Sequence, residues 1–169
     1  MLTKAGREQV AAVSEVVSRL PIGSIISSDL DRAQETASIV GQKLDMAWTC
    51  DSDLRERDFG YAQGRPLANL RPEWSGVEEG RVVNADARPP AGESLHDLSA
   101  RVDGFFCRLT EQPRRGDVLV VTHGGVIRVA LAKCDRVPVS KMAWGPVPNA
   151  GLWSIGTHEI CPSNLLSSV

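Results

Sequence analysis

The stretch that most constrains the fold is residues 117–122, Asp-Val-Leu-Val-Val-Thr, which His-Gly-Gly follows directly. An apolar run of this kind is typical of a buried strand in a parallel sheet. Shorter β-prone runs occupy 24–27 and 47–50, and helical apolar patterns follow at 33–44 and 126–134. Because strands alternate with helices, we predict an α/β fold whose mostly parallel sheet is covered on both faces and has right-handed crossovers.

Two more helices and one irregular stretch complete the predicted organisation. Apolar residues recur at steps of three and four after Thr3, a suitable N-cap, until Pro21 ends the pattern. A second strongly periodic helix follows Ser94 as its cap, and Ser28 or Asp29 offers a cap to the helix after the first strand. Residues 61–93 are rich in glycine and proline and predict a lid-like excursion, and 151–155 predict a last strand. We expect one domain over 1–169.

The composition excludes several classes of partner. The chain sets 19 Lys and Arg against 21 Asp and Glu, which gives a formal charge of −2 and argues against nucleic-acid or anionic-membrane binding. Four cysteines form no CxxC pair and are predicted to be buried, reduced thiols. The acidic residues have no metal-ligand spacing, so we expect neither a metal nor a cofactor. A small-molecule ligand and a cytoplasmic location are the default expectations.

Chemistry is expected where predicted strands end, because ligands bind at the carboxyl ends of strands in such sheets. His123 ends one strand, and the two glycines after it let backbone N–H groups approach an anion. The alternative is a core histidine beside a tight turn. Arg32 follows the other strand and suits a phosphate, which its planar fork binds through two parallel hydrogen bonds. The alternative is a surface ion pair with Asp29 or Glu35.

Glu56 is a third candidate, in a turn that carries charges of both signs over residues 51–60. A carboxyl group beside a bound phosphate can act as a general acid. The alternative is a surface ion pair with Arg55 or Arg57, and spacing alone favours neither interpretation.

Five segments, taken together and in this order, resemble the histidine phosphatase superfamily, also called phosphoglycerate mutase-like. These segments are Leu2–Gln9, Ser27–Ala37, Leu54–Gly60, Gly92–Ser94 and Val121–Arg128. The resemblance implies a three-layer α/β/α sandwich. It also implies that Arg32 binds a phosphoryl group together with His123 and Gly124, and that Glu56 donates a proton to the leaving oxygen.

One part of the family pattern has no match in this sequence. The family opens with a strand that ends in Arg-His-Gly, whose histidine attacks phosphorus, whereas the three histidines here are His96, His123 and His158. His123 matches a later motif, and the other two are expected on the surface. Covalent catalysis needs that nucleophile, so we expect a truncated chain that is weak or inactive as a phosphatase. The missing strand would leave two strand edges exposed, through which the chain could form a homodimer.

Two other interpretations stay open. In the first, the chain is a pseudophosphatase that binds a phosphate-bearing ligand or protein. In the second, the remaining pocket supports different chemistry, with His123 itself as base or nucleophile. For the whole family pattern, a phosphomonoester hydrolase is favoured over a mutase. The mutase branch carries extra basic residues, and no Lys or Arg-Arg pair lies between Gly60 and Gly92. The lid-like excursion over residues 61–93, called the covering stretch below, offers four candidate substrate contacts: Arg71, Trp74, Arg81 and Arg88.

Overall fold

The computed structural model describes residues 1–65 and 72–156 and divides the chain into two units. Unit 1 comprises Met1–Arg55, Gln112–His123 and Val147–Ser154. Unit 2 comprises Glu56–Glu111, Gly124–Pro146 and the residues from Ile155 onward, as far as they are described. The single domain expected over 1–169 stays a prediction.

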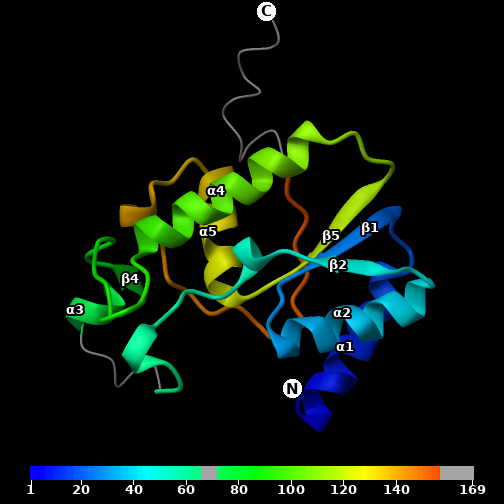
Figure 1. The fold of residues 1–169 in the computed structure, drawn as a ribbon, viewed down its shortest axis with the longest axis horizontal. Helices are drawn as coiled ribbons and strands as arrows, with labels where there is room; N and C mark the ends of the chain where they lie inside the picture. Colours follow the sequence, from blue (N-terminus) through cyan, green and yellow to red (C-terminus); the bar gives the residue numbers. More distant parts are fainter. Residues whose placement is uncertain (66–71, 157–169) are drawn as a thin grey trace, which may run out of the picture. The chain divides into compact units, whose positions relative to one another are not determined.

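Unit 1 contains the parallel sheet that the sequence predicts. Its strands are β1 (Ile22–Ser27), β2 (Trp48–Cys50) and β5 (Asp117–Val121), in the order β2-β1-β5. Both pairs are parallel, and Ser27 lies opposite Cys50 on one side and opposite Val121 on the other. The carboxyl ends of all three strands therefore meet at one edge of the sheet (Figure 1).

Helices α1 (Lys4–Val17) and α2 (Asp31–Leu44) pack together on this sheet (Figure 1). The Thr3 side chain accepts a hydrogen bond from the Gly6 N–H at 3.1 Å, which confirms the predicted cap. The shared core consists of apolar side chains from both helices and β1, at the spacings that the sequence shows: Val10, Val17, Ile25, Ala37 and Val40. Burying each of the larger ones contributes roughly 1.5–3 kcal/mol.

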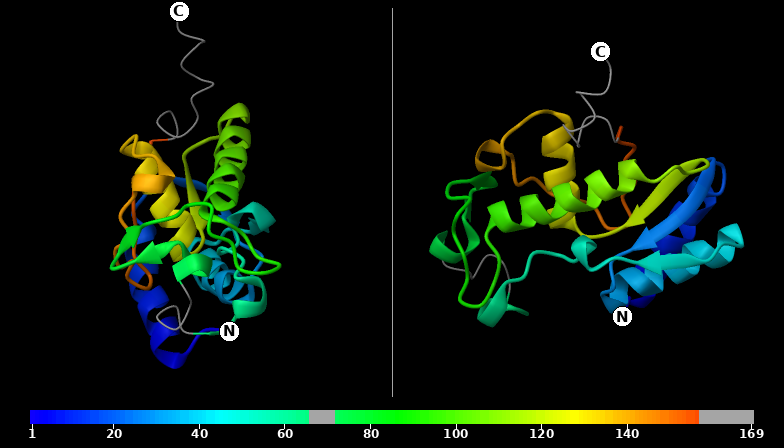
Figure 2. Two further views of the ribbon diagram at one scale, coloured as in Figure 1. Left: turned by 90° about the vertical axis from the view of Figure 1, so that its left-hand side faces the viewer. Right: turned by 45° about the horizontal axis from the view of Figure 1, so that its top comes forward.

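Unit 2 is built around α4 (Leu95–Glu111) and α5 (Gly124–Cys134), which contact each other (Figure 2). The periodic pattern after Ser94 predicts an apolar face on α4, and six apolar residues of this helix are buried: Leu95, Leu98, Val102, Phe105, Phe106 and Leu109. In its described part, the covering stretch contains only short elements, as its glycine and proline content predicts: η2 (Gly60–Ala62), α3 (Pro72–Ser75), β3 (Val77–Glu78) and β4 (Arg81–Val82). Short 3-10 turns η1 (Ser52–Leu54) and η4 (Val139–Lys141) belong to units 1 and 2, respectively.

Three structural predictions are wrong. Strand β5 is half-buried rather than buried, because within the described residues it pairs with β1 alone and so lies at an edge. Residues 151–156 form no strand, since no described strand lies alongside to exchange backbone hydrogen bonds. Neither Ser28 nor Asp29 is the N-cap of α2; that position is Leu30, because both polar side chains bind elsewhere.

The cysteine prediction is also wrong in part. Cys50 is exposed at the end of β2, which is the other edge strand of the sheet. Cys107 is disulfide-bonded at a half-buried position on α4, so it is not a reduced thiol. Cys134 is a half-buried thiol, and Cys161 lies outside the described residues.

Candidate functional site

Arg32 and His123 meet at the carboxyl edge of the sheet in unit 1. Arg32 lies in the first turn of α2, which follows β1, and His123 lies two residues beyond β5. Because β1 and β5 are parallel neighbours, both segments emerge at the same edge. The Arg32 Nε–H donates to Nδ1 of His123 at 3.1 Å. Both residues were expected at the carboxyl ends of strands, and the structure brings them into contact there.

Arg32 has no carboxylate partner among the described residues. Asp29 instead accepts two hydrogen bonds from the Arg55 guanidinium, at 2.7 and 2.6 Å. Glu35 accepts from the Leu2 backbone N–H at 2.6 Å and pairs with Arg7. The surface ion pairs that were the alternative interpretation of Arg32 are thus not formed. Its side chain is exposed, and its terminal nitrogens have no hydrogen-bond acceptor in the part of the chain described.

The pairings around Arg32 also set the electrostatics of the neighbouring carboxylates. The hydrogen bond from Arg55 holds the pKa of Asp29 below its usual value, and the nearby His123 acts in the same direction. The hydrogen bond from the Leu2 backbone N–H likewise lowers the pKa of Glu35, with help from Arg7. Both carboxylates are therefore stabilised as anions by groups other than Arg32.

Ser28 is a member of this site that the sequence argument treated only as a possible helix cap. Its residue is completely buried, and its Oγ lies 2.9 Å from Nε2 of His123. Its backbone N–H donates to the Val121 carbonyl at 2.8 Å, which joins the loop after β1 to the end of β5. A polar residue at a strand end, one position from a buried core residue, is the signal that could have identified it.

The Glu56 carboxylate lies at the N-terminus of α5 in unit 2. Both of its oxygens accept from the Gly125 N–H, each at 3.1 Å, and Oε1 also accepts from the Arg57 N–H at 2.9 Å. The helix N-terminus favours an anion, and here that anion is a side chain of the protein. A Cβ at Gly125 would lie 2.1 Å from Glu56 Oε1, so a larger residue there would displace the carboxylate from the helix N-terminus.

Arg57 does not pair with Glu56 but is a buried structural cation. Its residue is 1% exposed, and its guanidinium donates to four backbone carbonyls of the covering stretch, those of Trp74, Ser75, Ala87 and Glu93. These bonds measure 3.0, 2.5, 2.7 and 2.8 Å, respectively. Burial lowers the pKa of Arg57 to about 10, so the side chain remains charged at neutral pH.

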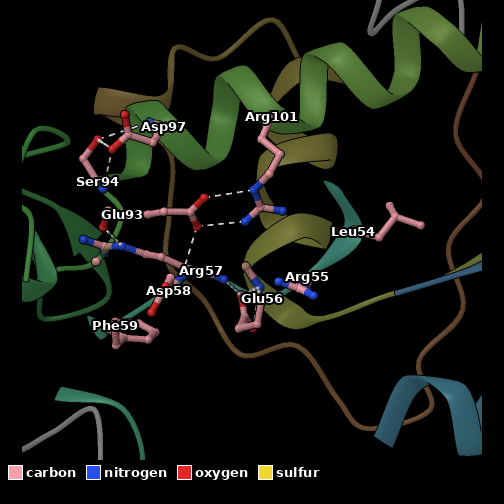
Figure 3. Close-up of polar contacts among 12 residues, drawn as sticks. Leu54, Arg55, Glu56, Arg57, Asp58, Phe59, Glu93, Ser94, Asp97 and Arg101 are labelled. Carbon is pink, nitrogen blue, oxygen red and sulfur yellow. Dashed lines mark hydrogen bonds and ion pairs between the residues drawn. The ribbon is translucent and has the colours of Figure 1, made fainter. Parts of the chain in front are cut away.

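A chain of polar contacts continues from Arg57 toward α4 (Figure 3). The Glu93 carboxylate accepts from Arg101 at 2.9 and 2.8 Å and from the Asp58 N–H at 3.0 Å. Ser94 caps α4, with its Oγ accepting from the Asp97 N–H at 3.1 Å while Asp97 accepts from the Ser94 N–H at 2.7 Å. This reciprocal pair is a capping box that fixes the end of the covering stretch on α4.

Three arginines of the covering stretch were candidate substrate contacts. Arg88 forms an ion pair with Asp97 at 2.6 Å, Arg81 lies exposed in β4, and Arg71 is outside the described residues. On α5, the half-buried Arg128 donates to the Gly145 carbonyl at 2.7 Å and stacks on Trp144 at 4.6 Å. Burial lowers the pKa of Arg128, while the charge of Glu56 opposes that shift.

The other histidines stay apart from these groups as far as the structure describes them. His96 is half-exposed and lies 3.8 Å from Asp86, as expected for a surface residue, whereas His158 lies outside the described residues. In the described ranges, no three His, Cys, Asp or Glu side chains gather into a possible metal site. Likewise, none of the helices described there has the length and apolar character needed to cross a bilayer.

Two chemical capabilities follow. Unit 1 presents the guanidinium fork of Arg32, which has no carboxylate partner among the described residues, beside the imidazole of His123; together they can bind a tetrahedral oxyanion. Unit 2 presents a carboxyl group held by backbone N–H groups at a helix N-terminus, which can exchange a proton. The chain passes from unit 1 to unit 2 directly after Arg55 and again directly after His123.

Comparison with known proteins identifies relatives that share this pattern. A probable phosphoglycerate mutase from Salmonella choleraesuis, GpmB, is 39% identical over 125 residues, which cover 73% of this chain and 58% of the relative. The chain thus spans less than two thirds of the length of the curated relatives that it matches. Among solved structures, a mycobacterial glucosyl-3-phosphoglycerate phosphatase is 29% identical with a TM-score of 0.69, covering 82% of this chain and 71% of that one.

A second structural relative, YhfR of Bacillus stearothermophilus, is 25% identical with a TM-score of 0.72, over 82% of this chain and 69% of that one. These structures confirm the predicted α/β fold with a parallel sheet. The model of the histidine phosphatase superfamily (branch 1) matches residues 1–165, nearly the whole chain. This chain therefore belongs to the histidine phosphatase superfamily.

Proposed function

We propose that this chain provides the phosphate-binding and acid-base groups of a hydrolase that acts on small phosphate monoesters. The observation that carries the proposal is the contact between Arg32 and His123 at the carboxyl edge of the sheet. It is supported by the absence, within the described residues, of any carboxylate on the Arg32 fork. A mobile surface arginine would not be expected to direct its Nε–H at an imidazole while both nearby carboxylates bind other groups.

In the proposed mechanism, the terminal nitrogens of Arg32 donate hydrogen bonds to two phosphoryl oxygens, and Nδ1 of His123, once it has gained a proton, donates to a third. These bonds stabilise the negative charge that builds up on the phosphoryl oxygens in the transition state. As the bond between phosphorus and the leaving oxygen breaks, the Glu56 carboxyl group gives its proton to that oxygen. The family resemblance assigns this role to Glu56, and it also suggests that the Gly124 N–H contacts the phosphoryl group.

The covalent step of the family requires an in-line histidine, and the resemblance assigns that role to none of His96, His123 and His158. His123 is unsuited to replace it in the structure, because both of its ring nitrogens are already engaged, Nδ1 by Arg32 and Nε2 by Ser28. We therefore propose that full activity requires a nucleophile on a segment that matches the family's Arg-His-Gly motif.

We propose a hydrolase rather than a mutase, which would transfer the phosphoryl group between two positions of its substrate. Curated relatives are named as probable phosphoglycerate mutases, whereas a structural relative is a glucosyl-3-phosphoglycerate phosphatase. The basic residues that distinguish the mutase branch have no counterpart between Gly60 and Gly92. The cytoplasmic location and the homodimer remain predictions.

A second candidate is a pseudophosphatase that binds a phosphate-bearing ligand without hydrolysing it. This candidate is favoured because none of the three histidines matches the family's nucleophile. A pocket without an in-line nucleophile retains binding and loses the covalent step.

Hydrolysis of p-nitrophenyl phosphate separates the two candidates. The assay compares this chain with a version extended by the codons that precede Met1, each with and without Arg32→Ala. We expect hydrolysis by the extended version, with a loss of at least about a hundredfold in kcat/KM on Arg32→Ala. Binding of inorganic phosphate without hydrolysis by either version would establish the pseudophosphatase. If neither version binds or hydrolyses, the proposed function is refuted.

A further inference from the structure

We propose that Ser28 is a positioning residue for His123, one that fixes which ring nitrogen of the imidazole faces the phosphoryl group. The inference deepens the proposed function, because it rests on the phosphate-binding role proposed for His123. The structure places the Ser28 Oγ 2.9 Å from Nε2 of His123 in a setting where the serine is fully buried and the histidine is 7% exposed. Neither the family pattern nor the sequence argument gives Ser28 a role toward this ring.

The tautomer of His123 follows from its two neighbours. An arginine side chain only donates hydrogen bonds, so the bond from Arg32 Nε–H requires a lone pair on His123 Nδ1. A neutral imidazole with an unprotonated Nδ1 carries its proton on Nε2. The Nε2–H therefore donates to the Ser28 hydroxyl oxygen, which also accepts from the Leu30 N–H at 3.3 Å.

Ser28 is well suited to this role because its backbone is fixed on both sides. Its N–H donates to the Val121 carbonyl at 2.8 Å, and its own carbonyl accepts from the Ser27 hydroxyl at 2.8 Å. The hydroxyl oxygen is thus held by the junction of β1 and β5, the same junction that brings His123 to the site. Removing it would take away the hydroxyl acceptor that lies 2.9 Å from the buried Nε2.

This arrangement has two consequences for the site. First, Nδ1 is the ring nitrogen beside Arg32, so the imidazole and the guanidinium fork address the same bound anion. Since Ser28 acts as an acceptor, its bond with Nε2–H persists whether or not Nδ1 gains a proton to donate to a phosphoryl oxygen. Second, Ser28 is not a nucleophile activated by His123, because a base would have to accept the serine proton at Nε2.

Long-range proton–nitrogen NMR on uniformly ¹⁵N-labelled protein tests the proposal directly. The His123 signals are assigned by their loss in His123→Asn. In the wild type we expect a protonated Nε2 and an unprotonated Nδ1. In Ser28→Ala the ring is no longer held in its orientation toward Arg32, so we expect it to populate both tautomers. In Ser28→Thr, which keeps the hydroxyl, we expect a return to the wild-type pattern. A matched control is Ser14→Ala, which removes another buried serine hydroxyl, bonded to the Val10 carbonyl in α1.

Titration with inorganic phosphate gives a second readout. Ser28→Ala should weaken binding by about tenfold, the equivalent of one lost hydrogen bond, and Ser14→Ala should leave it unchanged. A wild-type ring protonated mainly at Nδ1 overturns the proposal, even if no Ser28 variant folds. So does a Ser28→Ala protein with wild-type ring signals. If the wild type shows the expected tautomer but binds no phosphate, the role of Ser28 toward the ring stands and the proposed function fails.

Discussion

Arg57→Met should destabilise the protein more than the substitution of any single arginine within the covering stretch, residues 61–93. The change removes four hydrogen bonds to buried or half-buried carbonyls of Trp74, Ser75, Ala87 and Glu93 while keeping a long, unbranched side chain. A buried carbonyl left without a donor costs about 1–3 kcal/mol, and such costs add incompletely. We therefore expect a loss of about 3–5 kcal/mol in the free energy of unfolding, near the lower end of the sum over four carbonyls.

Urea denaturation followed by circular dichroism measures this loss. The matched control is Arg88→Met, because Arg88 lies in the same stretch with a side chain that is 56% exposed and bonded to Asp97. The control should lose at most about 1 kcal/mol, as exposed ion pairs do. Arg57→Lys should fall between the two, since one ammonium cannot reach all four carbonyls. If Arg57→Met loses less than about 1 kcal/mol, or no more than Arg88→Met, Arg57 does not organise the covering stretch.

Two further predictions concern the site itself. Gly125→Ala should lower the phosphatase activity of the extended version at least about tenfold, because the new Cβ displaces the end of the Glu56 side chain. The change in the free energy of unfolding should stay below about 1 kcal/mol, since only that flexible end has to move. A Glu56→Gln variant is the reference, and unchanged activity would contradict the placement of Glu56. Arg55 lowers the pKa of Asp29, so this pair should stabilise the fold above about pH 4 and lose that effect as the pH falls through the lowered pKa. The melting temperatures of the wild type and Asp29→Asn should therefore converge in acid. At neutral pH, their free energies of unfolding should differ by at most about 1 kcal/mol.

Local patterns in the sequence predicted those elements whose determinants lie close together along the chain. The cap at Thr3, the capping box of Ser94 and the inward face of α4 all follow from spacing within a few turns of helix. The pairing of Arg32 with His123 was also predictable, because parallel strands bring their carboxyl ends to one edge whatever the side chains are.

The predictions failed where the outcome depends on residues far away in the chain. Strand β5 has the composition of a central strand, but its burial depends on neighbours that its own sequence does not specify. Ser28 looked like a helix cap, and only the ring of His123, 95 residues later, shows where its hydroxyl points. Arg57 looked like a surface charge, and its four carbonyl partners lie 17 to 36 residues away.

The central claim is that Arg32 and His123 form a phosphate site, and calorimetric titration with inorganic phosphate tests it most directly. The variants compared are Arg32→Gln and Arg19→Gln, the latter an exposed arginine just beyond the end of α1. We predict saturable binding by the wild type, at least about tenfold weaker binding by Arg32→Gln, and wild-type affinity in Arg19→Gln. Equal affinities for phosphate in the wild type and Arg32→Gln would contradict the assignment of the site.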